Sequence, residues 1–314
     1  MDPAPAPEPA PQRGRRWHWQ RRRLDRLVAG ATMAAVLLVG VLIGGNRMRG
    51  DQPASTTTPA APPQTISLTF AATTPSGGRP DGAQLADTAR ILSRRLDAAG
   101  IHGGSVQERA GRLLVAVPAA QGRDDLDHLT VLLATPGRLE LRPVLQAASA
   151  ADPRPPFSTV RCTATPPAPA PDSPVVLCVR PPGVASTANA TVKLLVGPAR
   201  LGNREIAAAQ AVPSGLPADP TWQVVLRLTG QSGRLFQQLS AAAACQPADS
   251  IRRHIAIVLD GAIIEYPPVA EGIHCRESLS GGAIAISRLP EQEARTLAAL
   301  MTAGSLPVRL ERQP

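Results

Sequence analysis

A single uncharged segment near the N-terminus is the feature that most restricts how this chain folds. Leu27 to Gly45 reads LVAGATMAAVLLVGVLIGG, nineteen residues without a charged side chain. At 1.5 Å per residue a helix of this length spans about 28 Å, close to the hydrocarbon thickness of a bilayer. We therefore expect residues 27–45 to form one transmembrane helix.

The charges on either side of this segment predict its orientation. Seven arginines precede it, whereas only Arg47 and Arg49 follow it closely. Positive charge collects on the cytoplasmic side of membrane helices, so we expect residues 1–26 to be a cytoplasmic basic tail. A cleaved secretory signal is the alternative, but its apolar region is typically about 7–15 residues long and ends in a better cleavage site than Gly44-Gly45-Asn46. We favour an uncleaved single-pass signal-anchor in the cell membrane, with the remainder of the chain extracytoplasmic.

The net charge of +9 does not predict a nucleic-acid partner. Residues 1–51 hold nine arginines and four acidic residues, which accounts for +5 and leaves +4 for residues 52–314, without a basic run. The chain has only 3 Phe, 3 Trp and 1 Tyr, too few for a surface that stacks bases. We expect no nucleic-acid binding.

Catalytic and cofactor signals are also missing from the sequence. The five histidines have no neighbour at the spacing of a catalytic triad or a metal site. Glu291 and Glu293 suit the first turn of a helix, and Asp260-Gly261 is typical of a turn. We expect no catalytic residue, no metal, no cofactor and no small-molecule substrate, and hence no enzyme. The histidines are His18, His102, His128, His254 and His274.

The four cysteines all follow the membrane segment, in the expected oxidising compartment. An even number of cysteines there predicts disulfides. Three pairings are possible, and we favour the sequential one, which closes the shortest loops. A metal site that uses His274 and Cys275 is the alternative, but no Cys-x-x-Cys pair supports it. The favoured pairs are Cys162–Cys178 and Cys245–Cys275.

Proline divides the extracytoplasmic region. Residues 46–63 have the Pro/Thr/Ala composition of an extended linker. Residues 146–190 hold ten of the 34 prolines, and we expect them to be an insertion outside any core. This insertion separates two regions with clear apolar periodicity, at residues 64–145 and 191–303.

The first region predicts a β-α-β-β-α-β order. Ile66, Leu68 and Phe70 alternate as in a half-buried strand. Asp81 followed by Gln84 is a capping box, which begins a helix that ends near Gly100. Two further strands, a helix and a last strand through Leu139 and Leu141 complete the ferredoxin-like, split βαβ pattern. The fold class predicted for the extracytoplasmic part is therefore α+β, with this unit as its base.

The second region mixes helix and strand signals without repeating the first. A strand alternates from Trp222 to Leu228, and a short helix follows through Phe236. Asp260-Gly261 lies between two apolar runs and predicts a β-hairpin. Pro290 opens a last helix that ends at Gly304. Residues 304–314 then alternate as a strand, which we expect to return to the sheet of the first region.

These blocks resemble the first periplasmic domain of the SecD protein-export family. The segments ILSRRLDAAGI (91–101), SVQERAGRLLVAVPAA (105–120) and LLATPGRLELRPV (132–144) resemble its base. The segments TGQSGRLFQQLS (229–240), IAIVLDGAIIEYPPV (255–269) and AIAISRLPEQEARTLAALMTAGSLPVRL (283–310) resemble its head subdomain and return strand. The resemblance implies a base with an α+β head inserted before the last base strand.

Several departures from the family limit what the resemblance implies. No Asp-x-x-Gly-Gly signature occurs near Pro63 to Ile66, and a glycine usual in the family is replaced around Arg288. The 146–190 insertion is unlike the common form. The sequence given stops at Pro314, whereas SecD continues into five further membrane helices that work with SecF. We therefore expect a passive partner of protein export rather than a proton-driven motor.

The resemblance implies that the head contacts translocating or unfolded polypeptide, with Sec translocon components such as SecD/SecF or the SecY complex nearby. We expect exposed apolar residues of the hairpin to form the contact surface, although a hairpin core is the ordinary role for such residues. The alternative function is an extracytoplasmic envelope sensor or scaffold that kept the fold and lost the export role. The expected contact residues are Ile263, Ile264, Tyr266 and Val269.

Overall fold

The structure is a computed structural model, and it describes residues 64–119, 126–162, 169–180, 190–215, 220–275, 277 and 283–314. The expected tail, membrane helix and linker lie outside these residues. Among the described helices, none is both long and apolar enough to cross a bilayer.

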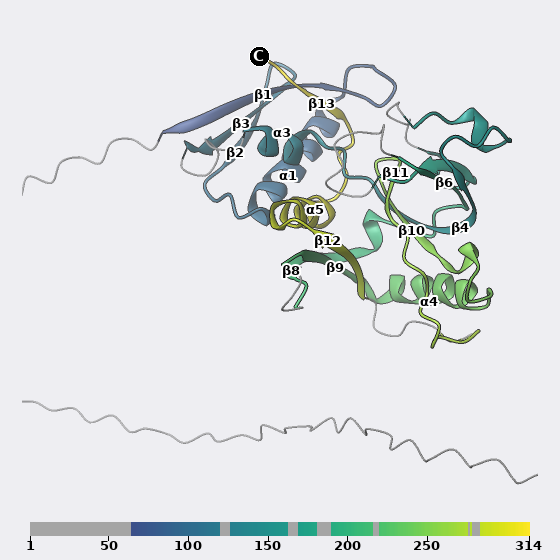
Figure 1. The fold of residues 1–314 in the computed structure, drawn as a ribbon. Helices are drawn as coiled ribbons and strands as arrows, with labels where there is room; N and C mark the ends of the chain where they lie inside the picture. The colour runs from purple at the N-terminus through teal and green to yellow at the C-terminus, as the bar shows by residue number, and fades with distance from the viewer. Residues whose placement is uncertain are drawn as a thin grey trace, which may run out of the picture. The chain divides into compact units, whose positions relative to one another are not determined.

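The first sheet and two helices correspond to the expected base (Figure 1). The strand order is β13-β1-β3-β2, with all neighbours antiparallel. Helices α1 and α3 pack on one face, and along β1 and β3 alternate side chains are buried against them. The bounds are Thr65–Thr73 for β1, Gly82–Ala98 for α1, Ser105–Arg109 for β2, Arg112–Pro118 for β3, Leu126–Ala134 for α3 and Arg309–Arg312 for β13.

Helix α1 begins and ends where the sequence predicts. The Asp81 carboxylate accepts a hydrogen bond from the Gln84 amide at 2.7 Å, and the Gln84 side chain accepts one from the Asp81 amide at 3.0 Å. This reciprocal pair is the predicted capping box. Gly100 follows the helix with φ +77°, a conformation that glycine adopts without strain.

The fourth strand of the base sheet is not the predicted one. Leu139 and Leu141 lie on β4 (Leu139–Ser149), which leaves the base and pairs with β10, β6 and β7. The place beside β1 belongs to β13, where Leu310 lies opposite Ala72. Alternation assigns the two faces of a strand but does not choose its partner, so the sequence could not exclude this exchange. The expected return of the C-terminal strand to the first sheet is confirmed.

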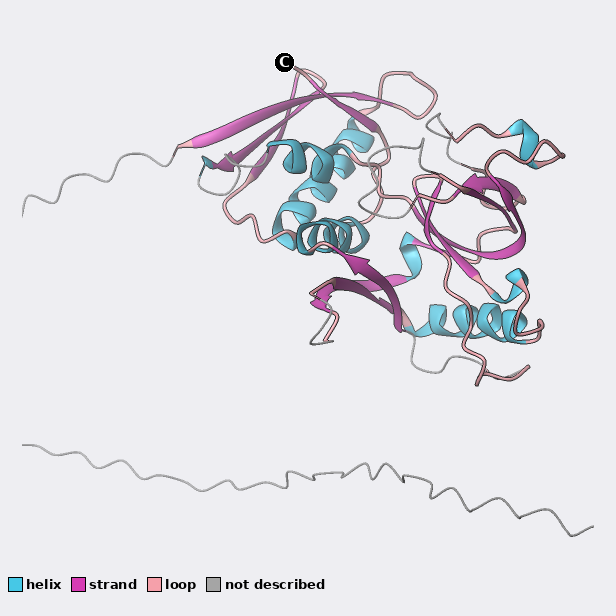
Figure 2. Ribbon diagram, in the orientation of Figure 1, coloured by secondary structure: helices cyan, strands magenta, loops and turns pink. Residues whose placement is uncertain are grey.

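The second sheet curls until its two ends meet (Figure 2). Its order is β11-β10-β4-β6-β5, with β7 paired beside β4. Val179, just after β5, forms a parallel bridge with Ile263 of β11, and the Arg180 amide donates to the Ile263 carbonyl at 2.7 Å. The bounds are Val175–Cys178 for β5, Val192–Val196 for β6, Leu201–Gly202 for β7, Ile255–Leu259 for β10 and Ala262–Glu265 for β11.

The expected insertion at 146–190 is partly built into this sheet. Strand β4 continues to Ser149, and β5 buries Val176 and Leu177. Phe157, in the 3₁₀ turn η1 (Phe157–Thr159), is also buried. The expectation that this segment lies outside any core is wrong, because its high proline content conceals the short apolar strand VVLC.

A third sheet and two helices complete the described chain. The sheet order is β12-β9-β8, and α4 and α5 pack with it around the largest apolar core. The predicted alternating strand from Trp222 and the helix through Phe236 are β9 and α4. The bounds are Ile206–Pro213 for β8, Trp222–Leu228 for β9, Gly230–Ala244 for α4, Ala283–Leu289 for β12 and Glu291–Ala303 for α5; the 3₁₀ turns η3 and η4 span Asn203–Glu205 and Ile251–Arg253.

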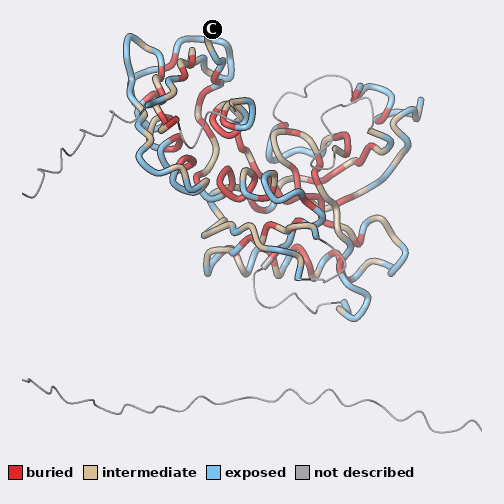
Figure 3. Tube along the Cα trace, turned by 60° about the vertical axis from the view of Figure 1, so that its left-hand side comes forward, coloured by how far each residue is buried: buried red, intermediate tan, exposed pale blue. Residues whose placement is uncertain are grey.

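Helix α5 contributes to two apolar cores at once. Ala294, Leu297 and Met301 lie in the core shared with α4 and the third sheet. Leu300 and Ala303 lie in the core beneath the base sheet. Almost every side chain in the second half of the helix is therefore buried, as the burial colouring of the trace shows (Figure 3).

Candidate functional site

An apolar pocket between the second and third sheets is the candidate site. Its volume is about 180 Å³, smaller than the ~300 Å³ at which pockets for drug-sized ligands begin. The pocket therefore has room for a single side chain rather than a cofactor. Its lining is Leu141, Phe236, Ile255, Ile257, Pro267, Pro268, Val269, Ile284 and Ala285.

The floor and the rim of this pocket differ in exposure. Leu141, Ile255 and Ile257 come from the curled sheet and are buried, as is Phe236 of α4. Pro268 and Ala285 are exposed and form the rim. An apolar group entering past the rim would lose its contact with water, which is favourable by about 25 cal/mol per Å² of apolar surface.

The four predicted contact residues do not form an exposed surface. Ile263 is 0% exposed and packs inside the curled sheet, and Ile264 and Val269 lie in the core around α4 and α5. Tyr266 is half-buried against the interior of the curled sheet. The expectation of an exposed apolar patch is wrong because β10 and β11 are covered on both faces. Val269 reaches the candidate site, as part of the pocket lining.

Buried Arg253 holds the segment that carries Val269. Its guanidinium donates to the Val269 carbonyl at 2.8 Å, to the Ala270 carbonyl at 2.8 Å and to the Ile273 carbonyl at 2.6 Å. It also donates to the Ala244 carbonyl at 2.7 Å, at the C-terminal end of α4, where a cation suits the helix dipole. One side chain thus fixes both α4 and the pocket wall.

The two disulfides join the cysteines in sequential pairs. Cys245, directly after α4, is bonded to Cys275, so this bridge closes the segment held by Arg253. Cys162 is bonded to Cys178 at the end of β5, in the curled sheet. The described residues include no free cysteine.

Glu265, at the end of β11, lies three residues before the rim residue Pro268. Its carboxylate accepts a hydrogen bond from the Ser287 amide of β12 at 3.0 Å. Burial raises the pKa of Glu265, and the bond from Ser287 and the charge of Arg288 offset part of that rise. The contact joins the end of β11 to β12 beside the pocket.

The turn of the predicted hairpin joins the curled sheet to the segment that follows α3 of the base. Asp260 and Gly261 have φ values of +49° and +80°, as a two-residue hairpin turn of this kind requires. The Asp260 carboxylate accepts hydrogen bonds from the Gly137 amide at 3.0 Å and from the Arg138 amide at 2.8 Å. Burial raises the pKa of Asp260, although these amides, Arg95 and Arg138 favour its charged form.

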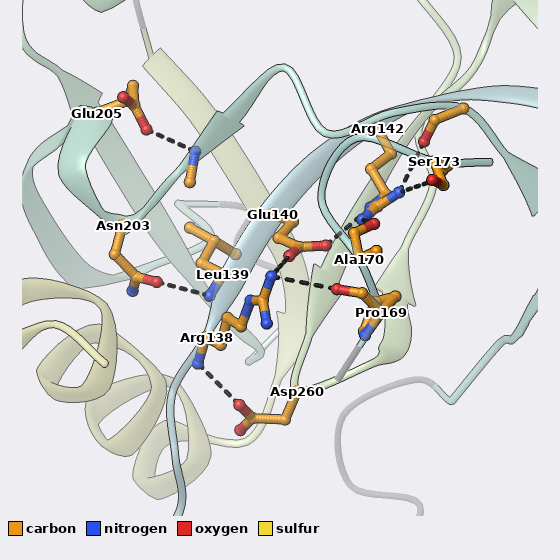
Figure 4. A network of polar contacts seen from close by, with 12 residues as sticks. Arg138, Leu139, Glu140, Arg142, Pro169, Ala170, Ser173, Asn203, Glu205 and Asp260 are labelled. Atoms are coloured by element: carbon orange, nitrogen blue, oxygen red, sulfur yellow. Dashed lines mark hydrogen bonds and ion pairs between the residues drawn. The ribbon is translucent and has the colours of Figure 1, made fainter. Parts of the chain in front are cut away.

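A second polar network surrounds the start of β4 (Figure 4). Glu140 forms ion pairs with Arg138 and Arg142, each at 2.8 Å. Arg142 is fully buried and also donates to the carbonyls of Ala170, Ser173 and Gly197 at 2.8–3.0 Å. These bonds fasten the insertion to the curled sheet.

The buried arginines are the residues that sequence reasoning missed. Arg95, Arg142 and Arg253 each bind several backbone carbonyls. The chain has 33 basic residues, of which Lys193 is the only lysine, so nothing in the sequence separates these three from exposed arginines. Within the described residues, no group of three or more His, Cys, Asp or Glu could hold a metal ion.

Comparison with known families and structures gives one consistent result. Residues 184–308 match the SecDF P1 head subdomain. The crystal structure of SecDF in its super-membrane-facing form is similar at 20% identity, with a TM-score of 0.54, over 82% of this chain and 32% of that one. A structure of SecDF, described as a membrane component that enhances protein export, is similar at 21% identity and a TM-score of 0.51, over 79% of this chain and 98% of that one.

The chain matches a small part of one SecDF structure and nearly all of the other. The chain spans about a third of the first SecDF structure. A search of curated proteins finds no match. The described residues have the fold of the SecDF structures, and the match of residues 184–308 to the P1 head subdomain confirms the resemblance to the periplasmic domain of the SecD/SecDF family.

Proposed function

We propose that this chain is an accessory protein of Sec-dependent protein export that binds unfolded or translocating polypeptide outside the membrane. The observation that carries the proposal is the apolar pocket of the head, which has an exposed rim and a buried floor. The match to the SecDF P1 head subdomain supports the export context. Residues 27–45 would hold the domain at the membrane, near translocon components such as SecD/SecF or the SecY complex.

The pocket chemistry supports capture of an extended chain rather than of a folded protein. Its volume of about 180 Å³ accepts one apolar side chain, and such side chains are accessible mainly when a polypeptide is unfolded. All the described side chains that line it are apolar, so none of them selects a bound side chain by hydrogen bonding. We propose a weak, sequence-tolerant contact that favours large apolar residues.

We also propose that binding is passive. None of the described residues that line the pocket carries a titratable side chain, so capture at these residues would not couple directly to proton uptake. A chain held on the outer side of the membrane cannot slide back until it is released, which biases diffusion without input of energy. The protein would then retain polypeptide beside the translocon without driving its movement.

The test places a bulky side chain on the pocket rim. Ala285→Trp should occlude the pocket, because Ala285 is exposed and lines it. Ser287→Trp is the matched control on the same strand, since Ser287 is exposed and is not part of the lining. A photo-reactive residue at Pro268 of the full-length protein in its membrane should cross-link to a secretory chain arrested during export.

We expect Ala285→Trp to reduce that cross-link several-fold and Ser287→Trp to leave it near the parent level. Equal cross-linking in both variants would rule out the pocket as the contact. A cross-link from Pro268 to a cell-wall protein, with export unchanged after depletion, would favour the envelope scaffold instead.

A further inference from the structure

Three arginines lie at the β2–β3 turn of the base sheet, outside the lining of the pocket. Arg109 and Arg112 lie directly opposite each other at the ends of the two strands. Arg79, from the loop after β1, places its Nη2 atom 3.1 Å from the position that a Cβ on Gly111 would occupy. All three arginines are exposed. We name this group (Arg79, Arg109 and Arg112) the arginine turn.

Arg109 and Arg112 of the arginine turn carry like charges at directly opposite strand positions. Like charges directly opposite on paired strands are destabilising. Within the described residues, none of the three arginines makes an ion pair or a side-chain hydrogen bond. Glu311 lies in the same row as Arg112, but β1 separates their strands, so their backbones are about 10 Å apart. An arrangement that costs stability in this way is typical of a functional site.

The open face of the base sheet forms a hollow at the same place. Its volume is about 470 Å³, and Thr69, Arg109, Ala110, Arg112 and Leu114 line it. Four of these residues lie on β1, β2 and β3, and by strand register they share the face opposite α1 and α3. The hollow therefore combines two guanidinium groups with the hydroxyl of Thr69.

We propose that the arginine turn binds a phosphate group. A guanidinium offers paired N–H donors that match two oxygens of a phosphate. Arg109 and Arg112 offer two such groups at the hollow, and Arg79 adds a third positive charge at the same turn. This set suits an anion with three or four oxygens and up to two charges, whereas a single carboxylate has two oxygens and one charge. The phosphate could belong to a lipid headgroup or to a soluble phosphate compound. Residues 46–63 would keep the domain within about 60 Å of the membrane segment, so lipid headgroups would be within its reach.

The binding test uses the full-length protein in nanodiscs of neutral phosphatidylcholine, with tripolyphosphate as the probe. We expect saturable binding by calorimetry, weakened at least about tenfold in Arg109→Gln/Arg112→Gln. Arg90→Gln/Arg94→Gln on exposed positions of α1 removes the same charge and should bind like the parent. An unfolding temperature of Arg109→Gln/Arg112→Gln at or above that of the parent would show that the turn still folds. We expect such a temperature because the variant removes a repulsive pair of charges.

Two results would overturn the proposal. One is equal weakening in both double variants, which would mean that net charge alone attracts the probe. The other is binding that does not saturate. Nanodiscs that contain phosphatidylglycerol distinguish the two sources of phosphate. Weaker binding of tripolyphosphate to the parent protein in these nanodiscs assigns the site to lipid headgroups, which compete with the probe. Unchanged affinity assigns the site to soluble phosphate compounds.

Discussion

The guanidinium group of Arg95 donates a hydrogen bond to the Gly304 carbonyl at 3.3 Å, although the two residues lie at opposite ends of the described chain. Arg95 is 0% exposed and also donates to the carbonyls of Leu132, Leu133, Thr135 and Pro136. It therefore joins the C-terminal ends of α1, α3 and α5. Burial lowers the pKa of Arg95 to about 10, so the group remains charged at neutral pH.

Replacing Arg95 with methionine should unfold the base readily. Arg95→Met keeps most of the side-chain volume but leaves several buried carbonyls without a donor, and we expect a loss of about 3–5 kcal/mol in the free energy of unfolding. Urea titration followed by circular dichroism measures it. Arg94→Met, at the exposed neighbouring position, should change stability by less than about 0.5 kcal/mol. Similar losses in both variants would contradict the assigned role.

Gly137 tests how tightly this junction is packed. It has φ +76°, and a Cβ at this position would lie 2.8 Å from Arg95 Nη2. Gly77 has φ +88° with no atom within 4 Å of such a Cβ, so Gly77→Ala carries the backbone cost of about 1 kcal/mol alone. We expect Gly137→Ala to lose at least about 1 kcal/mol more than Gly77→Ala in urea titrations. Equal losses of unfolding free energy in the two variants would show that the Arg95 side chain moves away from the added Cβ without cost.

Asp260 should contribute a stability that depends on pH in an unusual direction. Because burial raises its pKa, the native state keeps a proton at a pH where the unfolded carboxyl, with pKa near 3.9, has lost it. The contribution is fully present below about pH 4 and decreases as the pH rises through the native pKa. Asp260→Asn should remove this slope, and should lose about 1–3 kcal/mol because its amide nitrogen cannot accept a bond from a backbone amide.

The measurement for Asp260 is the free energy of unfolding between pH 4 and pH 7. Subtracting the Asp260→Asn curve from the parent curve should give a difference that falls with pH. Asp249→Asn, at an exposed position, should instead follow the parent curve. A difference that rises with pH would mean that the amides and arginines outweigh burial.

The two disulfides should affect the pocket differently. Cys245→Ser/Cys275→Ser frees the segment that carries the pocket wall, whereas Cys162→Ser/Cys178→Ser frees the insertion. Loop-closure entropy predicts a cost of about 3–4 kcal/mol for each pair, so their stabilities should be similar. We expect only the first variant to lose cross-linking from Pro268. Loss of cross-linking in both variants would mean that removal of either disulfide disturbs the whole head, and not the pocket wall alone.

Local signals in the sequence predicted individual elements well. The capping box at Asp81 and Gln84 and the hairpin turn at Asp260-Gly261 are both present, because each depends on residues close together in the chain. The pairing of β4 with β10, and of β13 with β1, depends on residues far apart. Alternation of apolar residues gives no information on that choice, which is why the sequence predicts the wrong fourth strand for the base sheet.

The candidate site was harder to predict than the fold. Ile263 and Ile264 are apolar and close to a turn, which made them candidates for an exposed surface, but a curled sheet with cores on both sides buries them. The pocket takes its lining from β4, α4, β10, β12 and the segment after β11, which no local pattern brings together. Only Val269 among the expected contact residues reaches it.

The pairing of β1 with β13 has a consequence for biosynthesis. β1 is the first described element and β13 is the last, so a growing chain exposes one edge of β1 until all other described elements have been made. An unpaired strand edge is prone to associate with other chains, and contacts between distant residues form slowly. Completion of the base should therefore be a late event in the folding of this domain, and the domain would depend most on chaperones in the period before it.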